Sequence, residues 1–300
     1  MAMKLGKPFY YLAFLCLLMA TKGCDLYEIE EYEGEVFVYS QMTAMDPLPR
    51  VELLMTSPHG EDFAPNKMFD GEADVTVYLL DQQGGREAEY NYHNSREGRY
   101  TYPQENGNMA RPLRTYELVV KLPESGKVIS SFTTVPDTFR VVHTVRDTVT
   151  FMQADPLEYH LTESAYPGRQ AHYMLATKSL DAENHGLTPK YESSDLFRPG
   201  FTHIRSEITN QAAFKNQSSL IMVPYPWDNI AHYGPNQLLF HAIDDNMYDF
   251  YRTLDHQTGS QNLAPGEIRG IKYNTKGGPG LFGSMATATA NAYIYKATKD

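Results

Sequence analysis

Residues 74–80 have the sequence DVTVYLL, and this stretch decides the fold class. Val75, Val77 and Leu79 alternate with other residues, which is the period-two pattern of a β-strand. The run DQQGG at 81–85 ends the strand, and EYNYH at 89–93 alternates again. Because glycine-rich runs between alternating segments are typical of turns, this region predicts antiparallel β-structure.

The same pattern extends outward through residues 36–137. Further strands are expected around Val36 and Val38 and at 51–55, 99–102, 116–122 and 128–134. Short strands at this spacing, without a convincing helix, predict a β-sandwich of immunoglobulin or prealbumin type. Domains of this type serve as spacers or binding modules.

Residues 138–300 predict a second, mostly β domain with one inserted short helix. Strands are expected at 144–151, 171–177, 202–208, 220–223, 237–243, 266–273 and 286–297, and loops at 156–168 and 181–191. Met247, Phe250, Tyr251 and Leu254 recur at helical spacing, so we expect a helix near 245–254. Asp244 or Asp245 is the expected N-cap of this helix.

The N-terminus has the features of a secretory signal. Lys4 and Lys7 precede FYYLAFLCLLMA at 9–20, which is too short to span a bilayer, and Gly23 precedes Cys24. A small residue before cysteine resembles the cleavage site of bacterial lipoproteins, which predicts a signal peptide at 1–23 and lipidation of Cys24. The alternatives are an ordinary cleaved signal and an uncleaved anchor. Residues 24–35 are acidic and predict a flexible tether or a surface-export signal.

Charge and cysteine content exclude several classes of function. The net charge is −11, and it becomes −14 without residues 1–23, which carry three lysines and no acid. Such an acidic chain is not expected to bind nucleic acid, and its membrane contact is expected to come from N-terminal acyl chains. Cys16 and Cys24 are the only cysteines, so the mature chain would have neither a disulfide nor a thiolate zinc site.

Five segments together resemble a family of Bacteroidota outer-membrane lipoproteins of unknown function. They are EVFVYSQMTAMDPLPRVELLMTS (35–57), GEADVTVYLLDQQGG (71–85), EGRYTY (97–102), RTYELVVKLP (114–123) and IKYNTKGGPGLFGS (271–284). Asn274 stands three residues before the double glycine, as in the family's glycine-rich run. The resemblance implies an outer-membrane location, and a TonB-dependent receptor as a candidate partner. It implies no catalytic residue.

No segment predicts catalysis, a cofactor or a metal. The glycines at 277–283 lack the lysine and the helix of a phosphate-binding loop, so a tight turn with Phe282 as a core plug is the simpler interpretation. No Gly-x-Ser-x-Gly or zinc-type histidine spacing occurs. His241, Asp244 and Asp245 could ligate a metal, but a strand residue and a helix cap explain them better.

The segment PYPWDN at 224–229 is the best predicted contact with a partner protein or glycan. Tyr225, Trp227, Asp228 and Asn229 could stack on a sugar or anchor an interface. The alternative, in which Trp227 fills the core, is favoured.

These observations predict a lipid-anchored, non-enzymatic envelope protein that presents β-sandwich modules to a partner, with an outer-membrane receptor as the candidate. A surface glycan-binding lipoprotein is the alternative. A hydrolase with an unrecognised carboxylate site is a more distant one.

Overall fold

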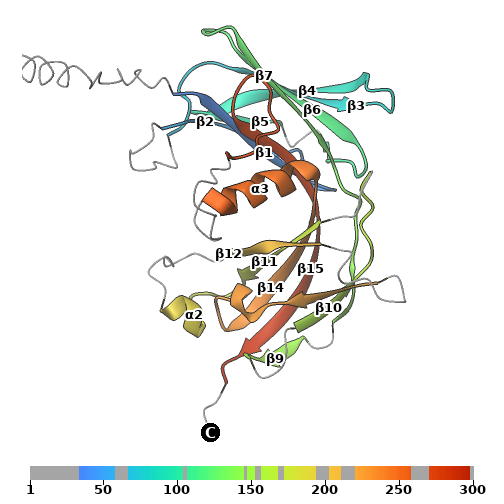
Figure 1. Ribbon diagram of the computed structural model, residues 1–300, viewed down its shortest axis with the longest axis vertical. Coiled ribbons are helices and arrows are strands. Elements are labelled where there is room, and N and C mark those ends of the chain that lie inside the picture. The colour runs from blue at the N-terminus through green and yellow to red at the C-terminus, as the bar shows by residue number, and fades with distance from the viewer. Residues whose placement is uncertain are drawn as a thin grey trace, which may run out of the picture.

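A computed structural model describes residues 34–57, 67–103, 107–144, 147–152, 157–167, 172–193, 203–210, 220–257 and 270–297. Within these residues the chain is mostly β, as predicted, with one helix longer than a single turn (Figure 1).

Residues 36–137 form seven strands, which confirms the predicted pattern. They are β1 (Val36–Thr43), β2 (Val51–Met55), β3 (Asp74–Leu80), β4 (Arg86–Arg96), β5 (Arg99–Thr101), β6 (Thr115–Leu122) and β7 (Lys127–Thr134). All their mutual pairings are antiparallel, in the order β1-β2-β5-β4-β3-β6-β7. Val75, Val77 and Leu79 of β3 are buried, so the alternation found in the sequence does mark the face that packs into the core.

The rest of the chain is also mostly β. Its strands are β8 (Val141–Thr144), β9 (Thr148–Thr150), β10 (Leu157–Leu161), β11 (His172–Ser179), β12 (His203–Asn210), β13 (Ile221–Tyr225), β14 (Gly234–Ile243) and β15 (Gly280–Tyr295). The helical elements are α2 (Pro189–Glu192), the 3-10 turn η3 (Trp227–Asn229) and α3 (Asp245–Gln257).

The long strand β15 joins the two parts. Its first residues pair in parallel with β1, and its later residues pair antiparallel with β14, so the sheet continues as β12-β11-β14-β15-β1. Figure 1 shows β15 curving from one part to the other, with α3 on its concave side. The predicted domain boundary after residue 137 falls between β7 and β8 and stays a prediction, because the sheet runs across it.

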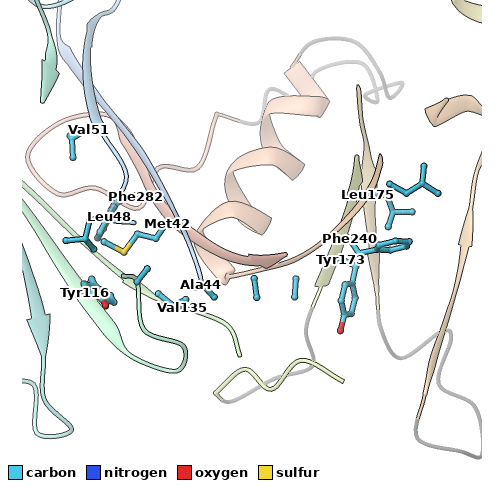
Figure 2. Packing of buried hydrophobic residues seen from close by; sticks show 14 of the residues in the cluster. Met42, Ala44, Leu48, Val51, Tyr116, Val135, Tyr173, Leu175, Phe240 and Phe282 are labelled. Atoms are coloured by element: carbon cyan, nitrogen blue, oxygen red, sulfur yellow. The ribbon is translucent and has the colours of Figure 1, made fainter. Parts of the chain in front are cut away.

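Most of the buried apolar side chains form one cluster, and a smaller cluster of Met174, Ile243 and Met247 packs between the sheet and α3. Figure 2 shows one labelled group with Met42, Tyr116 and Phe282, and another with Tyr173 and Phe240. A separate three-stranded sheet, in the order β13-β10-β8, covers the second group.

Two predictions for the second part were wrong. Residues 157–161 form β10 instead of lying in a loop, because Leu157, Tyr159 and Leu161 alternate into the core. The strand expected at 266–273 is absent at 270–273, and residues 266–269 lie outside the described part.

Candidate functional site

The predicted lipidation site and tether lie outside the described residues. Cys24 and positions 24–33 therefore have no structural account. Among the residues that are described, no helix has both the length and the apolar character needed to cross a membrane.

The structure places most of the predicted contact segment in the core. Tyr225 is fully buried, and its hydroxyl donates to the carbonyl of Ala176 at 2.7 Å. Trp227 is 8% exposed and packs edge-on against Phe151, with ring centroids 5.4 Å apart.

Asn229 is buried as well, and Asp228 alone stays exposed, 3.1 Å from the ammonium of Lys190. The core interpretation of Trp227 therefore holds. The aromatic rings of Tyr225 and Trp227 offer no surface to a glycan or protein, because they fill the space between β13 and its neighbours.

Asp244 is the N-cap of α3, as predicted. Its Oδ1 accepts a hydrogen bond of 2.8 Å from the backbone N–H of Met247, the third residue of the helix. His241 is a strand residue whose Nδ1 lies 2.8 Å from the hydroxyl of Thr287. Among the described residues, no group of histidines, cysteines and carboxylates could hold a metal ion.

The cap belongs to a buried polar junction between β7, β15 and α3. Thr133 Oγ1 donates to Asp244 Oδ2 at 2.5 Å, and Ser284 Oγ lies 3.4 Å from the same oxygen. Burial raises the pKa of the Asp244 carboxyl to about 6, because desolvation outweighs the hydrogen bonds from Thr133, Met247 and Ser284.

This junction is not arranged for catalysis. Ser284 is fully buried, and its hydroxyl donates to the carbonyl of Thr134 at 2.9 Å. A hydroxyl sealed from solvent and committed to a backbone carbonyl cannot attack a substrate. The junction instead fixes the helix to the sheet.

Only the first part of the glycine-rich run, around Gly277, forms the expected tight turn, because the run continues from Gly280 as the start of β15, and Asn274 organises this junction. The Asn274 amide nitrogen donates to Ser131 Oγ at 2.7 Å and to Phe282 O at 2.8 Å, while its oxygen accepts from Phe282 N at 3.0 Å. Gly277 has φ +90°, and a Cβ there would lie 2.1 Å from the carbonyl of Val128. Phe282 is fully buried, which confirms its predicted role as a core plug.

The best candidate interaction surface was not predicted. Met45, Met109 and Leu113 are 60%, 44% and 46% exposed, and we call them the apolar tip. Met45 and Leu113 have φ of +65° and +57°, which large side chains adopt rarely.

Backbone hydrogen bonds hold this tip rigidly. Met45 N donates to Ala110 O at 2.8 Å, Ala110 N donates to Asp46 O at 2.9 Å, and Leu113 N donates to Val135 O at 2.8 Å. These loops adjoin one group of core residues in Figure 2. The group includes Ala44, Leu48, Tyr116 and Val135, which lie beside the loops in the chain or bond to them. Exposed apolar side chains that gather on one surface are a feature of interaction sites, and the bonds between the Met45 and Ala110 segments bring these side chains together. The sequence signal for this surface was weak, because the segment MDPLPR at 45–50 also matches an ordinary turn.

The structural comparisons show only distant likeness. Trypsin-activated alpha-2-macroglobulin from Escherichia coli is 9% identical with a TM-score of 0.23, over 88% of this chain and 16% of that one. Salmonella alpha-2-macroglobulin reacted with methylamine is 10% identical with a TM-score of 0.23, over 90% of this chain and 16% of that one. The N-terminal four Ig domains of Dscam1 isoform 9.44 are 11% identical with a TM-score of 0.15, over 87% of this chain and 52% of that one.

The chain thus spans about a sixth of the length of these two macroglobulins. A comparison with curated protein sequences gave no match. A family model described as a domain of unknown function, DUF4249, matches residues 25–291. The match covers most of the chain, which therefore belongs to the DUF4249 family.

Proposed function

We propose that the chain is an exported, non-enzymatic envelope protein, anchored by lipid on Cys24, that presents its apolar tip to a partner protein. The candidate partner is an outer-membrane receptor of the TonB-dependent class. The signal-like N-terminus supports the anchor, and the family resemblance supports the outer membrane and the receptor. The exposed apolar tip is the observation that supports the binding role.

The backbone at the tip gives the physical argument. A non-glycine residue in the left-handed region costs about 1 kcal/mol, and glycine or asparagine would avoid most of this cost. Met45 and Leu113 adopt this conformation despite its free-energy cost, and their side chains are also exposed to solvent. Methionine is enriched at protein interfaces, so a partner that covers the tip explains both features.

The position of the tip relative to the tether fits this role. The tether would enter at Val36, the first residue of β1, and Met45 follows Thr43, the last one. Eight extended residues separate the two points by roughly 26 Å. An anchored chain would therefore hold the tip away from its attachment point.

Co-purification from detergent-solubilised membranes tests the proposal. The double variant Met45→Gly with Leu113→Gly removes both side chains and keeps the backbone conformation. We expect it to lose a receptor that the wild-type chain co-purifies, identified by mass spectrometry, with little change in Tm. Relief of strain offsets the entropy that glycine adds to the unfolded chain.

Met152→Gly is the matched control. Met152 also has positive φ and is 67% exposed, but it follows β9 in the other part of the chain. Retention of the receptor by the double variant would refute the role of the tip. A mature N-terminus without lipid on Cys24 would refute the anchor.

The two alternatives have different support. A hydrolase lacks a supporting observation, because the buried Asp244 carboxylate has no path to a substrate. Trp227 is buried and therefore cannot be the contact residue for a glycan. A second surface of the molecule nevertheless supports glycan binding.

A further inference from the structure

A cavity of about 320 Å³ lies at the C-terminal end of β15. Its lining comes from the loop Asn184, His185 and Gly186, from Tyr233 and Gly234, and from the residues Tyr293 to Lys296. We call it the tyrosine cleft. In Figure 1 the end of β15 lies at the opposite end of the molecule from β3 and β4.

The side of the cleft formed by residues 184–186 is held in place by specific contacts. Gly234 has φ +80°, and a Cβ there would lie 2.3 Å from the imidazole ring of His185, so only glycine lets this ring lie against the backbone. Tyr233 N donates to Gly186 O at 3.0 Å, and Leu187 pairs with His232. These contacts fix the loop on the segment that leads into β14.

The opposite wall is aromatic. Tyr293 and Tyr295 project from the same face of β15, with ring centroids 4.7 Å apart and planes inclined by 48°. Tyr295 is 51% exposed. The ring of His185 meets the edge of Tyr293 at 5.9 Å, and the Lys296 ammonium lies 5.7 Å from the centre of the Tyr233 ring.

Polar groups converge on these rings. Asn184 donates to Asp181 Oδ1 at 2.7 Å, and His185 Nε2 lies 3.4 Å from Asp181 Oδ2, which orients both side chains at the cleft. Thr289 and Asn291 are exposed on the same face of β15 as the two tyrosines. The surface leading away from the cleft therefore carries hydroxyl and amide groups.

We infer that the tyrosine cleft binds a saccharide. A pyranose ring has apolar C–H faces that pack on tyrosine rings, and hydroxyl groups around its edge that need both donors and acceptors. Tyr293 and Tyr295 supply the rings, and Asn184 and His185, oriented by Asp181, supply hydrogen-bonding groups.

The size and charge of the cleft disfavour two other classes of small ligand. It is large enough for a monosaccharide or disaccharide unit, and its polar lining does not suit a fully apolar ligand. The Asp181 carboxylate and the net charge of −11 disfavour a multiply charged anion. The inference does not depend on the lipid anchor or on the apolar tip.

Calorimetric titration of the purified full-length protein in detergent tests the inference. The probes are the neutral oligosaccharides cellohexaose, xylohexaose, mannohexaose and maltohexaose. We expect saturable binding of at least one probe, and a loss of about tenfold or more in affinity for Tyr295→Ala and for Asn184→Ala. Since both side chains are exposed, Tm should change little.

Tyr273→Ala is the matched control, because Tyr273 is 40% exposed and also contacts other rings, but lies next to α3. Flat titrations across the panel would overturn the inference. Binding that survives both cleft variants, or that Tyr273→Ala abolishes equally, would overturn the location.

Discussion

Replacing Asp244 with asparagine removes a charge from a fully buried site and keeps the shape of the side chain. The Asn oxygen can still accept from Met247 N, and its amide can donate to the hydroxyl oxygens of Thr133 or Ser284. The substitution therefore tests the effect of the buried charge with little change in packing.

The expected magnitude follows from the pKa. Burial raises the pKa of Asp244 from 3.8 to about 6, so the folded protein binds this proton more tightly than the unfolded chain. The associated stability is fully present below about pH 4 and is lost as the pH rises through about 6. A shift of about two units corresponds to about 3 kcal/mol.

Urea unfolding between about pH 4 and pH 7, followed by the fluorescence of the single Trp227, measures this effect. The free energy of unfolding of the wild type relative to Asp244→Asn should fall by about 2–3 kcal/mol over this range. Asp245→Asn, an exposed residue in the first turn of α3, is the control and should leave the wild-type profile unchanged. A constant difference between wild type and Asp244→Asn would refute the reasoning, because the carboxyl would then be ionised throughout.

Three further predictions concern stability. Asn274→Ala should lower the free energy of unfolding by about 1–3 kcal/mol in a urea titration, because it leaves the buried N–H of Phe282 without its side-chain acceptor, whereas the carbonyl of Phe282 keeps the Asn246 amide as a donor; an unchanged free energy of unfolding would contradict this. Trp227→Ala should cost about 3–5 kcal/mol, as expected of a core ring, and an unchanged Tm would contradict its burial. A fragment of residues 34–137 should show no cooperative thermal transition, since β1 loses its pairing with β15; a cooperative transition by circular dichroism would show that the segment folds alone.

The strands were the most predictable part of the fold. Alternation in β3 and β6 comes from local sequence, and each strand buries one face, so period and burial agree. The helix α3 was predictable for the same reason, since Met247 and Phe250 are buried one turn apart and Asp244 caps the helix.

Long-range pairing was not predictable in this way. Val38 pairs with Gly280, and nothing in the local pattern of either segment specifies a partner more than two hundred residues away. The role of Asn274 is similar: its motif was visible, but its hydrogen bonds to Ser131 and Phe282 depend on the packing of β7 beside β15.

The apolar tip could not be predicted for a different reason: its residues depart from the usual residue preferences of turns. Met45 and Leu113 of the apolar tip combine positive φ with exposed apolar side chains. A sequence pattern assigns such turn positions to glycine or asparagine and gives no reason for a methionine. Since natural sequences break local rules mainly where function requires it, strained and exposed apolar turns are stronger pointers to an interface here than the single tryptophan, which obeys the rules of a core residue.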